Sequence, residues 1–539
     1  GPIVSTLSVE SCAFNVERSF RSLRLQRVPT ALYRDAYKRV FFEPRRGTLA
    51  LYGRFNETVK RLADEWLPRV ETSEKFNQNR AALDAYHATL RPGDVTLVGL
   101  VAEGGQGMRT ANNARFLGYL QGTPQAAAIT AKRDMWTRRW LADAEIGARF
   151  VELLKRHGGN PARPLSDPAA WEACVEPLRE AFGDERLGVN RTALYRIVPA
   201  ASVATDEDFA FAWQRRKQDL WDRWRQTPEL ADFWSETADL LTGARAVNPT
   251  AKTLSDAAFC VVCQEALRWL DARKPKAGNA RTVLGLRSSE EYDDPADAPR
   301  VAAIYNGFCG RGTFAPFRKG DPEGNRWLDN EPLYIDWSAD AVKWLFENSG
   351  KREPRMPVIR NPHLYFTPGV TWSAVANHVV LKARLQAPCV FDADSMRLTP
   401  VGKTIHAHAF LAILNSDIFS FFKMKFIKHT QKWEIGDLRQ MPLVMPAKQQ
   451  ERQLKTLAGL CLEAKRLALD GRPATQELTL AARQWVAELH STGPRYLQPP
   501  AQACTLQSPE DCLAIFERAV NWEAEKLYGV EGLGPFDEF

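Results

Sequence analysis

The sequence predicts a mixed α/β protein with long helical segments: a helical connector, an irregular α/β domain with a helical insertion, and a helical C-terminal bundle. Two patterns predict this class. Apolar residues recur every three or four positions up to about residue 90, over 131–275 and after residue 446, whereas short β-prone runs separated by turn residues fill 300–446. The 539 residues are 45% hydrophobic, which suffices for more than one core. We expect parts at 1–90, 91–280, 281–446 and 447–539.

The first part reads as a helical connector. "ALYRDAYKRVFFEPRRG" and "ETVKRLADEWLPRVETSEKFNQNRAALDAYHATL" both have apolar residues at helical spacing. The next stretch, "RPGDVTLVGLVAEGG" at 91–105, is a short apolar run between glycines. This pattern predicts a buried strand directly after the connector.

A glycine cluster followed by polar residues, "GLVAEGGQGMRTANNARF", spans residues 99–116. It is not a phosphate-binding P-loop, because "MR" rather than Lys-Ser/Thr follows the last glycine. It is not a dinucleotide fingerprint either, because Thr110 stands where a third glycine is needed. The cluster therefore predicts a loop in which the backbone bends tightly or another molecule comes close, followed by side chains that form hydrogen bonds.

The predicted helical insertion contains one amphipathic helix with many arginines. "DFAFAWQRRKQDLWDRWRQTPEL" places Trp213, Leu220, Trp221 and Trp224 along one face. Its arginines lie elsewhere on the helix and form either a solvated basic side or a contact with a nucleic-acid backbone. Cys260 and Cys263 form a single CxxC inside a helical pattern, which favours a buried helix face over a metal site. Residues 280–330 are rich in Gly, Pro and Asp and read as a long loop.

The third part is irregular and the fourth is helical. His406 and His408 stand two apart at an expected strand end, where they read as structural or solvent-facing residues. The predicted C-terminal helix has apolar residues stepping by three and four at Leu454, Leu457, Cys461, Ala464 and Leu467.

Charge and cysteine usage limit the partners and the compartment. The formal charge is +7, a modest basic excess that permits a polyanionic partner without requiring one. The sequence has no apolar run of about 18 residues and no secretory pattern at its start, so we expect no membrane partner. Nine scattered cysteines, an odd number, favour a reducing compartment. We expect a cytoplasmic protein without a bound metal.

Two segments have the side chains that DNA contact requires. Bases are read by Arg, Lys, Asn and Gln, and phosphates are held by Lys, Arg, hydroxyls and backbone N–H groups. The glycine-rich segment offers Arg109, Thr110, Asn112, Asn113 and Arg115. The stretch "FFKMKFIKHTQKW" places four lysines within ten residues with no acid among them. For each lysine a solvated surface position remains the alternative. For the asparagines it is local capping of a tight turn.

Four motifs in one order resemble a known family. They are "GMRTANNARF", "FRKGDPEGNRWLDNEPLYIDW", "RNPHLYFTPGVTWS" and "FLAILNSDIFSFFKMKFIKHTQKWEIGDLRQMPLVMP". The set resembles the target-recognition half of the large adenine-specific DNA methyltransferases of type IIG and IIL restriction systems, and most closely PglX of BREX phage-defence systems. In that family a G-x-x-T-x-x-N-x-x-F segment opens the specificity domain, and a basic strand follows the L-N-S helix. The family more often has Thr-Gly where this chain has Thr110-Ala111.

The resemblance implies double-stranded DNA as a partner, together with a catalytic methyltransferase domain or subunit and possible contact with other defence-system proteins. The glycine-rich S-adenosylmethionine turn and the N-P-P-Y motif of such enzymes are absent from this sequence. We therefore expect the chain alone to bind no S-adenosylmethionine and to transfer no methyl group, although the parent enzyme would use that cofactor. Two other classes stay open: a protein-interaction scaffold of a defence complex and an RNA-binding protein. The expected DNA contacts are Gly105, Gly107, Arg109, Thr110, Asn112, Asn113, Arg115, Arg318, Lys319, Thr371, Trp372, Ser373, Lys423, Lys425, Lys428, Gln431, Lys432 and Trp433.

Overall fold

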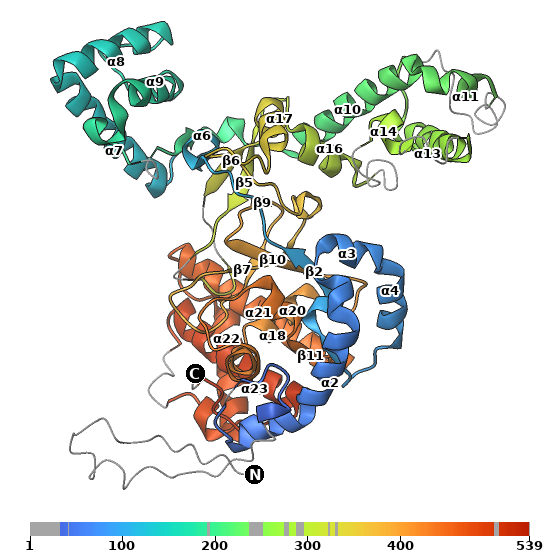
Figure 1. The fold of residues 1–539 in the computed structure, drawn as a ribbon. Coiled ribbons are helices and arrows are strands. Elements are labelled where there is room, and N and C mark those ends of the chain that lie inside the picture. Colours follow the sequence, from blue (N-terminus) through green and yellow to red (C-terminus); the bar gives the residue numbers. More distant parts are fainter. Residues whose placement is uncertain are drawn as a thin grey trace, which may run out of the picture.

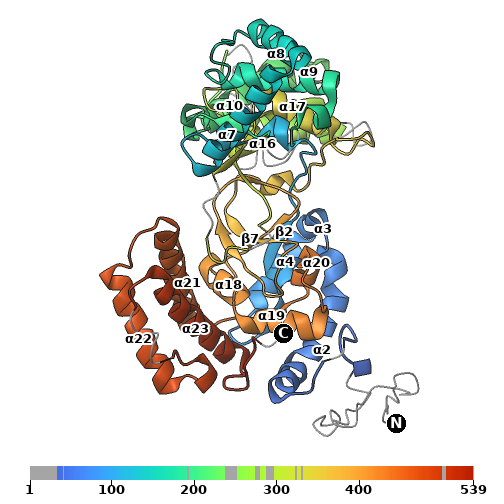
Figure 2. The ribbon, with the colours of Figure 1, turned by 90° about the vertical axis from the view of Figure 1, so that its left-hand side faces the viewer.

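The computed structural model describes residues 33–537 apart from 41, 191–193, 237–251, 274–279, 287–295, 322–323, 329–331 and 501–505. The protein is a mixed α/β protein, as predicted, with three small sheets of two, four and five strands in the described residues. Figure 1 shows a body at one end and two helical arms that extend to opposite sides at the other. Figure 2, a view turned by 90°, shows that both arms lie at the same end of the molecule, beyond the body.

The body joins N-terminal and C-terminal segments in one hydrophobic core. Its first helices are α2 (Arg46–Val70), α3 (Ser73–Gln78) and α4 (Arg80–Thr89). Its later helices are α5 (Val98–Val101), α18 (Ala407–Leu414), α19 (Asp417–Phe422), α20 (Ile435–Arg439), α21 (Lys448–Leu469), α22 (Gln476–Thr492) and α23 (Pro509–Tyr528). All five apolar residues that predicted α21 are buried. The helical C-terminal bundle is therefore confirmed.

Two antiparallel sheets connect distant parts of the chain inside the body. The smaller sheet pairs β1 (Val95–Leu97) with β11 (Pro442–Val444). The four-stranded sheet has the order β2 (Ala102–Gly105), β10 (Ser395–Pro400), β7 (Gly369–Ser373) and β8 (Arg384–Gln386). The single strand expected at 91–105 is thus two short strands that join two sheets, because the helical turn α5 separates them.

A five-stranded sheet lies between the two arms (Figure 1). Its order is β4 (Arg196–Val198), β3 (Leu117–Leu120), β6 (Leu333–Asp336), β5 (Phe314–Arg318) and β9 (Val390–Phe391). The β3–β4 and β5–β9 pairs are parallel, and the other two pairs are antiparallel. The helices α16 (Ala298–Asn306) and α17 (Ala339–Asn348) contribute buried residues to the core of this sheet.

Each arm has a core of its own, rich in tryptophan. The first arm consists of α7 (Pro124–Ala142), α8 (Ala144–Arg156) and α9 (Pro168–Leu187). The indole rings of Trp140 and Trp171 stack there with centroids 5.5 Å apart. Both rings are fully buried, so this arm is an independently packed unit inserted between β3 and β4.

The second arm consists of α10 (Asp206–Gln226), α11 (Ala231–Glu236), α13 (Asp256–Arg273) and α14 (Ala280–Leu284). The predicted apolar face of α10 is buried in its core. The guanidinium groups of Arg216 and Arg223 donate to the carbonyl oxygens of Gly285 and Val283, 2.8 and 3.4 Å away. These two arginines therefore hold the C-terminal end of α14. Cys260 and Cys263 are both buried on α13, as predicted.

Three expectations, on the loop at 280–330, the boundary at 280 and His406, are not met. Residues 280–330 are not one long loop, because α14, α16 and β5 lie within them. The boundary expected at residue 280 separates no two sheets, since every sheet pairs strands from both sides of it. His406 caps the start of α18 rather than ending a strand.

Candidate nucleic-acid interface

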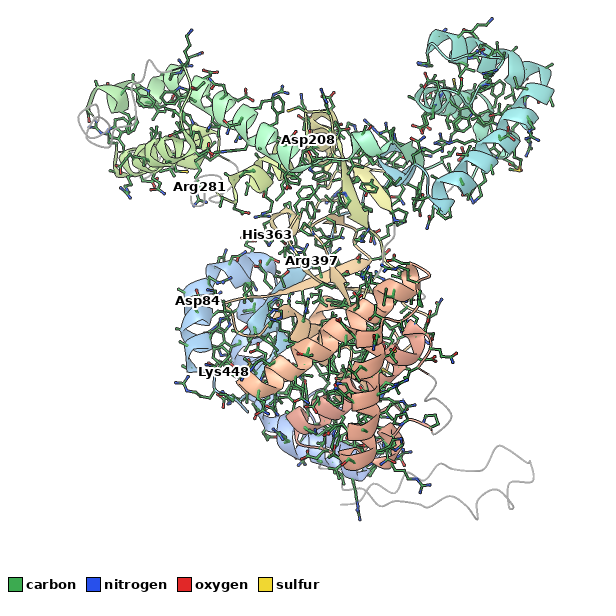
Figure 3. All side chains as sticks on the ribbon, turned by 180° about the vertical axis from the view of Figure 1, so that it is seen from behind. Asp84, Asp208, Arg281, His363, Arg397 and Lys448 are labelled. Carbon is green, nitrogen blue, oxygen red and sulfur yellow. The ribbon has the colours of Figure 1, made fainter. Side chains whose placement is uncertain are left out.

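The glycine-rich segment crosses from the body to the five-stranded sheet, and two distant segments flank it there. Gly107 and Met108 donate their N–H groups to the carbonyl oxygens of Asp392 and Phe391, at 3.2 and 2.9 Å. Arg109 and Val358 exchange two backbone hydrogen bonds of 2.9 Å. The segments 107–109, 356–358 and 391–394 thus form a hydrogen-bonded platform, the term used below for these three segments. Figure 3 labels His363 and Arg397 close to this junction.

The glycines of this segment are needed because the chain itself comes close to them. A Cβ atom on Gly104 would lie 1.9 Å from the carbonyl oxygen of Arg397, and one on Gly107 would lie 1.9 Å from that of Phe391. A Cβ atom on Gly105 would lie 2.2 Å from Nδ2 of Asn361. Gly105 and Gly107 are both buried. The molecule that approaches them is therefore the protein's own backbone and Asn361, and the expected exposure of these two glycines to DNA is not met.

Two buried arginines, Arg397 and Arg439, donate hydrogen bonds to backbone groups of the body next to this segment. Arg397 donates to the carbonyl oxygen of Leu364 at 2.9 Å and to Oγ1 of Thr367 at 2.6 Å. Arg439 donates to the carbonyl oxygen of Gly104 at 2.7 Å. Burial lowers the pKa of each guanidinium to about 10. Both remain charged at neutral pH, so each acts as a multiple donor to backbone carbonyl groups.

A cavity of about 360 Å³, called the basic cleft below, opens beside the platform. Four of its lining residues are basic and two are acidic. The platform, the first arm and the loop after β5 all contribute to it. The lining consists of Arg109, Thr110, Ala111, Asn112, Asn113, Ala114, Arg179, Phe317, Lys319, Arg355, Asp392 and Asp394. The first two family-like motifs therefore meet at this cleft, with four of the expected contacts of the first motif and Lys319 of the second.

The four cations of the basic cleft differ in how free they are. Arg179 is held by Asp184 and Glu176, each with a closest distance of 2.5 Å, and little of its side chain is exposed. Lys319 donates to the hydroxyl group of Tyr195 at 3.2 Å. Arg109 and Arg355 are exposed, and neither side chain has a partner among the described residues. These two guanidinium groups are the ones available to a ligand.

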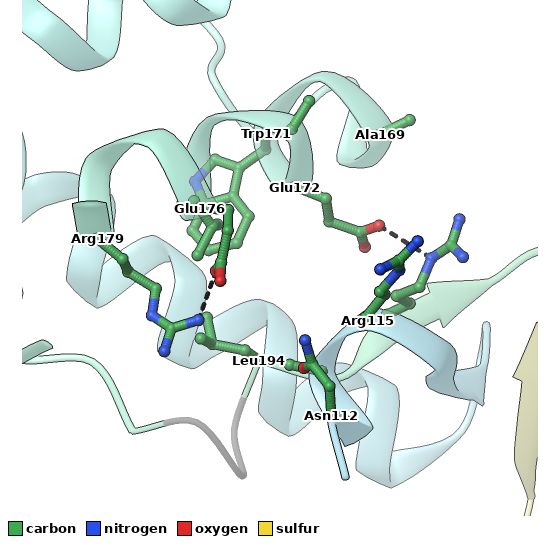
Figure 4. A pocket seen from close by; sticks show the side chains of 12 residues that line it. Asn112, Arg115, Ala169, Trp171, Glu172, Glu176, Arg179 and Leu194 are labelled. Carbon is green, nitrogen blue, oxygen red and sulfur yellow. Dashed lines mark hydrogen bonds and ion pairs between the residues drawn. The ribbon is translucent and has the colours of Figure 1, made fainter. Parts of the chain in front are cut away.

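A second cavity of about 520 Å³ adjoins the basic cleft and shares Asn112, Ala114 and Arg179 with it. Figure 4 shows Asn112 and Arg115 on one side of this cavity and α9 on the other. Its acidic residues Glu172 and Glu176 are paired with arginines. The loop that carries the predicted polar residues therefore stands between two hollows at the base of the first arm.

The polar residues of this loop are partly used by the protein itself. Thr110 donates to Oδ1 of Asn113, and Nδ2 of Asn113 lies 3.4 Å from the hydroxyl group of Tyr195. Arg115 is exposed, but its guanidinium lies over the ring of Trp344 at 4.2 Å. Thr110 and Asn113 therefore fix the loop. Asn112 is half-buried in the cavity wall.

Ala111 occupies a backbone conformation that favours glycine, with φ +54°. An L-residue with a Cβ atom pays about 1 kcal/mol in this region. The family that the sequence resembles more often has glycine at this position. We expect Ala111→Gly to raise the free energy of unfolding by about 0.5–1 kcal/mol, measured by urea unfolding. Ala128→Gly, on the exposed side of α7, is the control and should lower it by about 1 kcal/mol. Equal losses in both variants would contradict this explanation.

The last three residues of the third family-like motif lie inside the body rather than on its surface. Thr371 and Trp372 are fully buried, and Ser373 is 7% exposed. Trp372 donates Nε1–H to the carbonyl oxygen of Trp433, 2.9 Å away, and Trp433 is buried as well. Thr371, Trp372, Ser373 and Trp433 therefore do not form the expected DNA contacts. These buried residues instead join β7 to the middle of the fourth motif through the hydrogen bond from Trp372 to Trp433.

The lysine stretch is not a free basic surface. Residues Lys423–Ile427 continue α19 as a π-helical turn, not the strand that the family pattern implies. Lys423 is fully buried, where burial lowers its pKa to about 8, and its ammonium lies over the ring of Trp433. Lys428 and Lys432 pair with Glu434 at 2.9 and 2.6 Å. These two ammonium groups hold the pKa of Glu434 at about 2.

The remaining expected contacts are scattered. Lys425 is half-buried beside the ring of Phe421, and Gln431 is exposed. Arg318 is half-buried on β5, next to Lys319. Sequence reasoning missed four charged residues of the basic cleft, namely Arg179, Arg355, Asp392 and Asp394. No local sequence signal marks them, because the pairing of the platform segments brings Arg355, Asp392 and Asp394 to Arg109, and the packing of the first arm brings Arg179.

Other classes of site receive no support from the described residues. No group of three or more metal-ligating side chains occurs among them. None of their helices combines the length and apolarity needed to cross a bilayer.

The sequence matches no protein-family model and no curated protein.

Proposed function

We propose that this chain is the sequence-specific double-stranded DNA recognition region of an adenine-N6 DNA methyltransferase of a phage-defence or restriction-modification system. Its partners are duplex DNA and a catalytic methyltransferase domain or subunit, which would bind S-adenosylmethionine and the target adenine. This chain has neither the S-adenosylmethionine turn nor the N-P-P-Y motif, so its own contribution would be binding and positioning.

The meeting of the family-like motifs is the observation that carries this proposal. Asn361 of the third motif donates to the carbonyl oxygen of Gln106, 255 positions away in the sequence, at 2.8 Å. The platform then joins the first motif to residues 356–358, which lie between the second and third motifs, and to residues 391–394, which lie between the third and fourth. The first and second motifs, which are far apart in the sequence, thus line one cleft that contains exposed guanidinium groups. This is the kind of surface that phosphates and base edges bind.

The test is the binding of the full chain to labelled duplex DNA, followed by fluorescence anisotropy across a salt series. We expect Arg109→Ala and Arg355→Ala each to weaken duplex binding by about 1–3 kcal/mol. A variant that loses a phosphate contact should also show a salt slope shallower by about 0.9. Arg483→Ala, which removes an exposed arginine from α22 on the body, is the matched control and should bind like the parent.

Three results would contradict the proposal. The parent chain could show no salt-dependent binding to duplex DNA, or the control could weaken binding as much as the cleft variants. A clear preference for single-stranded RNA over duplex DNA would instead favour an RNA-binding protein.

A further inference from the structure

The basic cleft contains two carboxylates, Asp392 and Asp394, among its cations. A surface that binds only phosphates gains nothing from an acidic side chain, since a carboxylate repels the phosphate and reduces the local positive potential. The carboxylates therefore either stabilise the protein itself or contact something other than phosphate. Their hydrogen bonds distinguish these two roles.

Asp392 stabilises the turn between β9 and β10. Its Oδ1 accepts hydrogen bonds from the backbone N–H groups of Asp394 and Ser395, at 2.7 and 3.1 Å. Burial raises its pKa to about 6. The carboxylate of Asp392 is thus occupied by the protein's own backbone.

Asp394 differs from Asp392 in its exposure and in the hydrogen bonds of its side chain. It is exposed, and its side chain has no partner among the described residues. Its backbone is nevertheless held firmly, because its carbonyl oxygen accepts from the N–H group of Ala374 at 2.9 Å. Gly320 packs so closely that a Cβ atom there would lie 2.9 Å from that of Asp394. A free carboxylate therefore stands on a fixed part of the cleft wall.

The free groups of the cleft form a mixed set of donors and acceptors. Arg109 and Arg355 offer guanidinium donors, whereas Asp394 offers only an acceptor. In the major groove of DNA, guanine presents acceptors and cytosine presents its N4 amino group as a donor. A set of this composition matches the edge of a base pair, whereas a phosphate matches the arginines alone.

We infer that Asp394 is a specificity-determining residue of the basic cleft, whose carboxylate accepts a hydrogen bond from the N4 amino group of a cytosine in the major groove. This inference rests on the proposed function, because it names the chemical group that the same cleft reads. Arg109 and Arg355 hold the neighbouring phosphates or the guanine edge.

Selection from randomised DNA duplexes tests the inference without knowledge of the target sequence. The full chain, its Asp394→Ala variant and an Asp340→Ala control are each used to enrich bound duplexes. Asp340 is an exposed aspartate in the first turn of α17, outside the cleft lining, so the control removes the same charge elsewhere. We expect the parent and the control to enrich one motif, and Asp394→Ala to enrich that motif with a single cytosine position relaxed.

A second measurement identifies the chemical group. The cytosine at the relaxed position is replaced by an analogue that lacks the N4 amino group, and the affinity of each protein is measured. The parent should lose about tenfold in affinity, within the range of one base contact, and Asp394→Ala should lose nothing further. Circular dichroism spectra that match the parent's would show that the exposed substitution leaves the fold intact.

Two results would overturn the inference while leaving the proposed function standing. Asp394→Ala could enrich the parent's motif unchanged, or it could bind all duplexes more tightly by the same factor, as expected if the carboxylate only reduces the local potential. If the parent binds no duplex DNA at all, the proposed function itself fails, and the inference fails with it.

Discussion

Replacing Gly107 by alanine should lower the free energy of unfolding by about 3 kcal/mol or more, the upper range for overpacking. The new Cβ atom would lie 1.9 Å from the carbonyl oxygen of Phe391 and 2.7 Å from that of Asp392. Both are backbone atoms of the platform, so no side chain can rotate away to relieve the contact. The segment must move instead, and it would lose the hydrogen bond from Gly107 to Asp392.

Urea unfolding followed by circular dichroism measures this effect, and Gly459→Ala is the matched control. Gly459 lies inside α21, where a Cβ atom meets nothing within 4 Å. Alanine is favoured over glycine in a helix interior by about 1 kcal/mol, so the control should gain stability. A Gly107→Ala variant as stable as the parent would show that the platform segments do not pack as described.

The same variant separates two explanations of the glycine cluster. If Gly107 served only to let DNA approach, alanine would reduce DNA binding and leave stability unchanged. In the structure the close neighbour is the protein itself, so we expect stability and DNA binding to fall together. Arg109→Ala provides the contrast, because an exposed side chain without partners among the described residues should affect binding and leave the unfolding midpoint close to that of the parent.

The helices of the arms and of the C-terminal bundle could be predicted because their information is local. Trp213, Leu220, Trp221 and Trp224 repeat at helical spacing, and all four are buried on one face of α10. Burial of such a face stabilises a helix wherever the partner lies in the sequence. The pattern therefore predicts the element without predicting what it packs against.

The sheets could not be predicted because they depend on pairing between distant segments, whereas the lysine stretch was misread because its acidic partner lies just beyond it in the sequence. The glycine-rich run is an edge strand only because β10 pairs with it, about 300 residues later. The lysines after α19 look unpaired in the sequence, yet Glu434 lies within 2.9 Å of both Lys428 and Lys432. The lysine stretch as read from the sequence ends at Trp433, one residue before Glu434. It therefore leaves out the acid that pairs with these two lysines.

Only those residues of the candidate site that belong to a local sequence motif could be predicted. Arg109 and Lys319 belong to recognisable motifs, and both line the basic cleft. Arg355 and Asp394 belong to none of the four motifs and reach the cleft only through the backbone pairing of the platform.

A single buried carboxyl group should make the body less stable as the pH rises. Glu525 lies on α23 and is 3% exposed. Its Oε2 accepts from the hydroxyl group of Tyr496 at 2.6 Å and from the N–H group of Gly532 at 3.1 Å. Its pKa is raised from 4.5 to about 7, chiefly by burial and also by the nearby carboxylates of Asp417 and Glu531, which together outweigh the lowering by these hydrogen bonds. Glu525 therefore binds a proton more tightly in the folded protein than in the unfolded chain.

The sign of the pH dependence follows from this difference. The folded protein is stabilised by the proton on Glu525 at pH values below 4.5, where both states bind it. Between about pH 4.5 and 7 the unfolded chain releases the proton first, so the contribution is lost progressively and is absent above pH 7. One pKa unit corresponds to about 1.4 kcal/mol, so the whole effect is on the order of 3 kcal/mol.

Glu525→Gln should remove the contribution of Glu525 to this dependence, because the neutral amide keeps an oxygen for Tyr496 and Gly532 but does not ionise. We expect the variant to unfold at a higher temperature than the parent at pH 8, and at nearly the same temperature at pH 4.5. Glu477→Gln, on the exposed first turn of α22, is the control and should follow the parent at both pH values. Parallel curves for the parent and Glu525→Gln would mean that Glu525 is ionised in the folded protein at pH 4.5 and above. A loss of stability towards high pH would then have to come from other carboxyl groups whose pKa burial raises, namely Asp417 in the same pocket and Asp392 in the basic cleft.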